Sequence, residues 1–175
     1  MTTALLVVDM QVALVKGAFN EQDVLNHAQQ LISLARAASA PVIFVQHCHA
    51  SFEPMKKGSA GWEVHPQLEP QATDLRLEKE ASDAFYGTSL AETLRERGVT
   101  QVVICGMMTE FCVDATARSA LSHDFDVILA RDAHTTGDST LSAAEIIAHH
   151  NSVLPAVVHP SKRIKALPSS EVAFT

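Results

Sequence analysis

Cys112 is the residue of this sequence best placed for covalent chemistry. It stands in the stretch Cys105-Gly-Met-Met-Thr-Glu-Phe-Cys112-Val, where an apolar run at 101–105 predicts a buried strand and residues 113–121 predict a helix. Unpaired N–H groups at a helix start favour negative charge, so we expect them to lower the pKa of the thiol and suit it to act as a nucleophile. The alternative interpretation is a small buried apolar residue, as most free cysteines are.

Two charged residues that follow other predicted strands could assist this thiol. Asp9 comes directly after an apolar run, and partial desolvation there would raise the pKa of its carboxyl toward the range of a general base. Lys79 follows a weaker strand and could stabilise both a thiolate and a carboxylate. The alternatives are a capping aspartate in a solvated turn and an exposed lysine between two glutamates.

Asp132 and His134 follow a further predicted strand. We interpret Asp132 as structural, because the carboxylate of an Asp-Ala turn usually accepts hydrogen bonds from backbone N–H groups. His134 is the one histidine placed where it could form a Cys–His dyad with Cys112. Cys105 lies inside a predicted strand and is interpreted as a core residue.

The elements that must position these residues alternate between apolar runs and amphipathic stretches. The predicted strands are 4–8, 42–45, 75–77, 102–105, 127–130 and 153–158, and the predicted helices are 23–38, 88–97, 109–122 and 140–150. This order predicts one α/β domain over residues 1–175, with three α/β/α layers and a mostly parallel, Rossmann-like sheet of about six strands. Ligands of such sheets bind at the carboxyl ends of the strands. No element is predicted in the polar tail, 161–175.

The segment 46–72 is rich in proline and glycine and is long for a loop in a compact domain, which favours a functional role. Its part 50–66 carries Phe52, Met55 and Trp62, which a monomer would have to bury or expose. We therefore expect a homodimer or homotetramer with this loop near a subunit contact.

Composition excludes several classes of partner. The net charge is −7 with no long basic cluster, which argues against nucleic acid and anionic membranes as partners. No apolar stretch approaches the roughly 20 residues that span a bilayer. The N-terminal run has no cationic start typical of a signal peptide. Three cysteines at unrelated spacings predict no disulfide framework, so we expect a reducing, cytoplasmic location.

Four motifs together resemble the isochorismatase-like cysteine hydrolase family, over roughly residues 4–158. They are Ala4-Leu-Leu-Val-Val-Asp9-Met-Gln11, Lys79 followed by Asp83-Ala-Phe-Tyr-Gly-Thr88, Gly106-Met-Met-Thr109-Glu-Phe-Cys112-Val, and Arg131-Asp132-Ala133. The resemblance implies the isochorismatase-like hydrolase fold and a catalytic triad of Asp9, Lys79 and Cys112. It also implies a cis peptide near Met107–Met108 and an oxyanion hole formed by the backbone N–H groups of Met108 and Cys112.

The chemistry that this resemblance implies is hydrolysis of an amide-type C–N bond in a small molecule, through a thioester on Cys112. Members named for isochorismate cleave a vinyl ether instead and can lack the cysteine, so Cys112 favours thiol chemistry. The remaining alternative is a degenerate hydrolase fold that only binds a small molecule.

Some relatives in the family, the nicotinamidases, carry an Asp-x-His…His metal site after the second strand. Here the corresponding stretch is Gln46-His47-Cys48-His49, with His65 further on, and the aspartate is missing. We therefore predict no metal and no other cofactor, although His-x-His can bind zinc or iron.

Residues in or beside the loops are predicted to line the substrate pocket, since aromatic and polar side chains there could contact a small ligand. These predicted substrate contacts are Gln11, Phe19, His47, Trp62, Phe85 and Tyr86. For each aromatic residue the alternative is packing under a loop.

Overall fold

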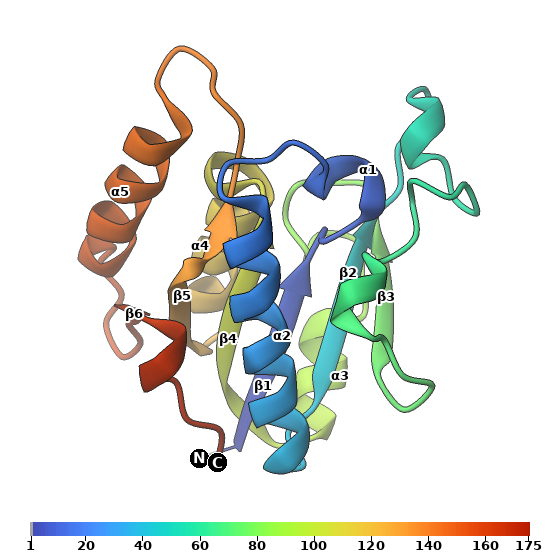
Figure 1. Ribbon diagram of the computed structural model, residues 1–175. Helices are drawn as coiled ribbons and strands as arrows, with labels where there is room; N and C mark the ends of the chain where they lie inside the picture. Colours follow the sequence, from blue (N-terminus) through green and yellow to red (C-terminus); the bar gives the residue numbers. More distant parts are fainter. Residues whose placement is uncertain (1) are drawn as a thin grey trace.

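The computed structural model describes residues 2–175 and contains one six-stranded sheet in which every pairing is parallel. The strand order is β3-β2-β1-β4-β5-β6, so β1 lies near the centre (Figure 1). The strands are β1 (Thr2–Val8), β2 (Val42–His47), β3 (Leu75–Lys79), β4 (Val99–Met107), β5 (Asp126–Thr135) and β6 (Ile164–Leu167). The prediction of a parallel sheet of about six strands is confirmed.

Helices cover both faces of the sheet. They are α1 (Val12–Val15), α2 (Glu21–Ala37), α3 (Leu90–Glu96), α4 (Asp114–Ser122) and α5 (Ala143–Val153). Alternate residues of β1 point to opposite faces: Leu5 packs with the apolar side of α2, and Leu6 packs with α3 and α4. Figure 1 shows α2 on the near face and α3 and α4 behind the sheet. The predicted three-layer arrangement is therefore correct.

The sixth strand was predicted in the wrong place. The segment 153–158 ends helix α5 and continues as the 3-10 turn Leu154–Ala156, in which Leu154 packs into the core and Val158 is 94% exposed. A short apolar run does not distinguish a strand from the end of a helix by periodicity. The sixth strand is instead Ile164–Leu167, which pairs with β5 from inside the tail that was predicted to hold no element.

The long loop between β2 and β3 is more ordered than its composition suggests. It contains the 3-10 turns Glu53–Met55 and Pro66–Leu68. Met55 and Trp62 are buried within the chain, whereas Phe52 is 48% exposed. Of the three apolar residues that suggested a subunit contact, Phe52 alone is therefore left for solvent or another molecule.

The carboxyl ends of β1 and β4 approach each other closely beside the loop that carries Cys112. Gly106 in β4 has a positive φ of 125°, and a Cβ atom there would lie 1.9 Å from the carbonyl oxygen of Val8. Only glycine permits this approach.

No helix among residues 2–175 is long and apolar enough to cross a bilayer.

Candidate active site

Asp9, Lys79 and Cys112 meet at the carboxyl ends of β1, β3 and β4. The Lys79 ammonium nitrogen lies 2.8 Å from Asp9 Oδ2 and 3.3 Å from Cys112 Sγ. Lys79 ends β3 beside His47 of β2, so its long side chain must cross β2 to reach β1. Parallel strands bring their carboxyl ends to one edge of the sheet, which is why residues 33 to 103 positions apart converge here.

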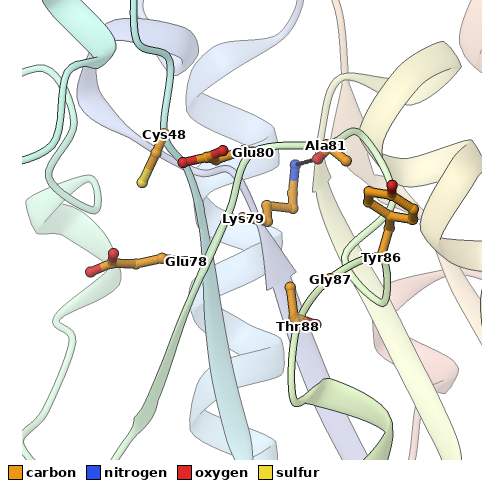
Figure 2. A pocket seen from close by; sticks show the side chains of 8 residues that line it. All are labelled: Cys48, Glu78, Lys79, Glu80, Ala81, Tyr86, Gly87 and Thr88. Carbon is orange, nitrogen blue, oxygen red and sulfur yellow. Dashed lines mark hydrogen bonds between the residues drawn. The ribbon is translucent and has the colours of Figure 1, made fainter.

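The ammonium group of Lys79 is the centre of this cluster. Besides Asp9 and Cys112 it contacts the carbonyl oxygen of Ala81 at 3.0 Å, drawn in Figure 2, and His47 Nδ1 at 3.2 Å. Burial, and then the charge of Lys79, lower the pKa of His47, so the imidazole is neutral and can accept a hydrogen bond. An ammonium group has three protons, and here four acceptors share them.

Asp9 has the properties of a general base. Its side chain is buried, and this burial raises the pKa of the carboxyl, while the charge of Lys79 acts in the opposite direction. Oδ2 is held by Lys79, whereas Oδ1 is buried and has no hydrogen-bond partner. Asp9 also has a positive φ of 51°, a conformation that non-glycine residues adopt mainly where the structure constrains them. Oδ1 is therefore the atom free to accept a proton.

The expected lowering of the thiol pKa is contradicted. Burial and then the charge of Asp9 raise the pKa of Cys112 to about 11, and Lys79 offsets only part of this rise. Cys112 does lie at a helix start, in the π-helical turn Thr109–Val113 that precedes α4. Burial beside a carboxylate disfavours the thiolate more than the helix start favours it. At neutral pH the thiol is therefore protonated, beside the close contact between the Asp9 carboxyl and the Lys79 side chain.

The backbone around the cysteine turns sharply. The peptide bond between Met107 and Met108 is cis, and the carbonyl oxygen of Met108 accepts hydrogen bonds from the N–H groups of Phe111 and Val113. Cys112 is the fourth residue of this turn, which leads directly into α4.

A chain of hydrogen bonds that runs from the surface into the interior supports this turn. The side-chain amide of Asn151 donates a hydrogen bond to the carbonyl oxygen of Arg131. This bond orients the amide so that Asn151 Oδ1 lies 3.0 Å from His134 Nε2. Burial lowers the pKa of His134 to about 4, so the ring is neutral, and its Nδ1 accepts from the Thr109 hydroxyl at 2.9 Å. His134 thus braces Thr109 instead of forming a dyad with Cys112.

Asp132 is structural, as interpreted from the sequence. Its carboxylate accepts hydrogen bonds from the N–H and hydroxyl groups of Ser169, at 2.8 and 3.0 Å. These bonds tie the C-terminal segment to β5.

A cavity of about 400 Å³ opens over the thiol. Its walls are mostly apolar, and both Asp9 and Cys112 line it. The lining residues are Asp9, Leu14, His47, His49, Phe52, Met55, Ser82, Met108, Phe111 and Cys112. Sequence reasoning missed Leu14, Ser82 and Phe111 altogether, and it considered Phe52 and Met55 only as subunit contacts. Phe111 could have been found, because it directly precedes the cysteine in the motif.

A second cavity of about 420 Å³ is lined by Lys79 and lies over the end of β3 and the loop that follows it (Figure 2). Cys48, Glu78, Glu80 and Tyr86 are among its lining residues, and Tyr86 is 74% exposed. Neither Asp9 nor Cys112 lines it. The cavity over Cys112 is therefore the one that can present a substrate to the thiol.

Of the six predicted substrate contacts, His47 lines the cavity over Cys112 and Tyr86 lines the second one. Gln11 has its side-chain amide engaged by backbone: it donates to the carbonyl oxygens of Trp62 and His47, and accepts from the His47 N–H group. Gln11 thereby joins the end of β1 to β2 and the long loop.

The other three aromatic residues lie away from the cavity over Cys112. Trp62 belongs to the long loop and is buried, and its carbonyl oxygen accepts hydrogen bonds from the side chains of Gln46 and Gln11. Phe85 stacks on His123 and Phe125, with ring centroids 4.8 and 6.0 Å apart. The backbone of Phe19 bonds to Thr135 and Thr136.

The residues around the thiol do not fit a metal ion. Asp9, His47 and Cys112 have ligand atoms within 4.8 Å of one another, and they form the one such group of three among residues 2–175. The Lys79 ammonium lies within 3.3 Å of an atom of each of them. A second cation among these atoms would be repelled by that charge. The ammonium group takes the place that a metal would need.

Proteins similar to this chain carry hydrolase names. A family model described as Isochorismatase domain matches residues 3–155. Streptothricin hydrolase of Streptomyces noursei is 41% identical over 138 residues, which are 77% of this chain and 55% of that protein, so the chain spans about half the length of this relative. Nicotinamidase 3 of Arabidopsis thaliana is 34% identical over 160 residues, 82% of this chain and 78% of that protein. The crystal structure of N-carbamoylsarcosine amidase from Thermoplasma acidophilum superposes with a TM-score of 0.82 at 28% identity, covering 98% of this chain and 99% of that one.

Replacing Asp9 by Asn should make the Cys112 thiol more reactive at neutral pH. The carboxylate raises the thiol pKa, and without it the Lys79 ammonium faces a thiolate alone, so the pKa falls and the thiolate fraction at pH 7.5 rises. Since one pKa unit is a tenfold change in that fraction, we expect iodoacetamide to modify Cys112 about tenfold faster or more. Mass spectrometry of the Cys112 peptide measures the rate.

The matched control for this experiment is Glu80→Gln, which removes an exposed carboxylate near Lys79 that does not contact the thiol. It should leave the Cys112 rate within about twofold, because solvent screens its charge. Cys48 in the same chain serves as an internal reference. A Cys112 rate in Asp9→Asn at or below that of the unchanged protein would contradict the role assigned to the carboxylate.

Acidification should destabilise the fold through His134. Its folded pKa of about 4 lies below the ordinary 6.5, so between these pH values the unfolded chain binds a proton that the folded chain does not. The stabilisation is complete above pH 6.5 and is lost as the pH falls toward 4, by up to about 3 kcal/mol. Urea unfolding of the unchanged protein and of His134→Gln should show a stability difference that shrinks over this range. A constant difference would contradict the prediction.

Proposed function

The chain belongs to the isochorismatase family, and on that premise we propose that it is a cysteine hydrolase that cleaves an amide-type C–N bond in a small molecule through a thioester on Cys112. The observation that carries the proposal is the single ammonium group of Lys79, bonded to both Asp9 Oδ2 and Cys112 Sγ. The hydrolase, nicotinamidase and amidase names of similar proteins support the same bond class.

The first step is attack of Cys112 Sγ on the substrate carbonyl carbon. With a thiol pKa near 11, a free thiolate is rare at neutral pH, so the proton leaves as the C–S bond forms. Asp9 Oδ1, which has no other partner, takes that proton. Lys79 stays within bonding distance of both groups, so its charge stabilises whichever of them is negative.

The tetrahedral oxyanion is held by the backbone N–H groups of Met108 and Cys112. Asp9 then returns its proton to the leaving nitrogen, and the C–N bond breaks to leave the acyl group on Sγ. Asp9 next removes a proton from a water molecule, which attacks the thioester and releases the acid. The net reaction consumes one water and yields an acid and an amine, with the thiol regenerated.

Substitution of the nucleophile tests this proposal. Cys112→Ala and Cys112→Ser should reduce turnover by about a thousandfold or more while leaving the fold intact, because the thioester cannot form. Ammonia release from a panel of small primary amides, ureas and carbamoyl compounds measures activity, and circular dichroism measures folding. Cys48→Ser is the matched control and should keep full activity.

More than a few per cent of activity in Cys112→Ala would rule out the thioester, and would favour the vinyl-ether hydrolysis of isochorismatases or another route. Absence of turnover on every amide tested, together with ligand binding, would favour a binding module instead.

We also propose that the protein acts as a homodimer or homotetramer in a reducing cytoplasm. All three cysteines are free, which supports such a compartment. Phe52 and Phe111 are large apolar residues left about half exposed at the cavity, which supports a nearby subunit contact.

Light scattering over a dilution series should therefore give two or four times the chain mass of 18.9 kDa. Full activity at the mass of one chain, at every concentration, would exclude the assembly.

A further inference from the structure

The walls of the catalytic cavity define what kind of acyl group can reach Cys112. Leaving aside the reacting groups, the side chains that face it are two imidazoles, one serine and five apolar residues. No arginine or lysine is among the residues that line it, and Lys79 beneath it already shares its charge among four acceptors. A carboxylate on the substrate would find no free cation to pair with there.

Phe52 and Phe111 are the distinctive part of these walls. They come from two segments far apart in sequence, the loop after β2 and the turn that carries Cys112. Both line the same cavity, and they are 48% and 53% exposed. Exposed aromatic surface at a concave site is covered favourably by an apolar ligand. Met55 and Met108, which also line the cavity, are flexible side chains that can adjust to its shape.

The reacting groups form only a small part of the cavity wall. Cys112 and Asp9 both line it, and apolar side chains make up most of the remainder. A cavity of roughly 150 Å³ is enough to hold a benzene molecule, so about 400 Å³ accommodates one ring with its carboxamide and a small substituent. A small polar amide or a urea would leave the apolar walls in contact with water.

We infer that the substrate is a carboxamide with an uncharged, flat, apolar acyl group that packs against Phe52 and Phe111, and that these two residues determine specificity. The inference rests on the proposed function for the reaction itself. It goes further in excluding anionic acyl groups, among them dicarboxylates, and in assigning recognition to two residues that do not belong to the triad.

The test separates binding from turnover by using the Cys112→Ala protein for affinity and the unchanged protein for catalysis. The probes are benzamide, its anionic analogue 4-carbamoylbenzoate, and acetamide. Calorimetric titration of Cys112→Ala should give benzamide an affinity about tenfold or more above each of the other two, a difference of the size that one well-placed aromatic contact produces. Adding Phe52→Ala or Phe111→Ala should weaken benzamide binding by about tenfold.

The matched control is Leu141→Ala, which removes a side chain that is 51% exposed and does not line the cavity. It should leave the affinity unchanged. In the otherwise unchanged protein, the two phenylalanine substitutions should raise KM for benzamide with a smaller effect on kcat, because the rings contact the acyl group and not the reacting atoms.

Each remaining outcome decides one of the two proposals. Binding of 4-carbamoylbenzoate or acetamide as tight as that of benzamide, or no effect of either phenylalanine substitution, would overturn the inference. A change in assembly mass on light scattering without a change in benzamide affinity would show that the two rings belong to a subunit contact, and would overturn it as well. The expected pattern of affinities without any hydrolysis would support the inference and overturn the proposed function.

Discussion

The buried ammonium group of Lys79 is the interaction on which the site depends. It holds the carboxylate of Asp9 at 2.8 Å and the thiol of Cys112 at 3.3 Å, and it is itself shielded from water. Removing one partner of a buried ion pair leaves an uncompensated charge, which is strongly destabilising. The sheet order β3-β2-β1-β4 places the ends of the three parent strands within reach of one lysine side chain. The strand order of the sheet therefore determines which residues the Lys79 ammonium group can contact.

The electrostatics of the cluster determine the protonation of the Cys112 thiol. Burial raises the pKa of both Asp9 and Cys112, and the positive charge of Lys79 opposes this rise at each of the two groups. A protonated thiol is less open to alkylation and oxidation than a thiolate, and the nearby Oδ1 of Asp9 has no hydrogen-bond partner of its own. The His134–Asn151 chain contributes geometry to this arrangement by fixing Thr109 at the start of the turn.

The sequence predicted the location of polar residues correctly where that location depends on the strand ends alone. Asp9 and Lys79 needed only a parallel sheet to be brought together. Gln11 remains a predicted substrate contact, but its location at a strand end has a second use. Its side-chain amide makes three hydrogen bonds to backbone groups, which the sequence did not indicate. The sixth strand was misplaced because β6 buries little and pairs along one edge, so it has a weak apolar signature.

The sequence by itself determined the three-layer parallel fold, because apolar periodicity along the chain is a local property that can be read without coordinates. It also placed Asp9, Lys79 and Cys112 after strands, and the structure brings these three residues into contact. The tertiary structure alone decided the protonation of the thiol and the shape of the cavity. Burial raised the pKa of Cys112 against the expected influence of the helix start. Phe52 and Phe111 became walls of one cavity only when segments 59 residues apart packed beside each other. Desolvation and packing sum over neighbours that are distant in sequence, and no local pattern records them.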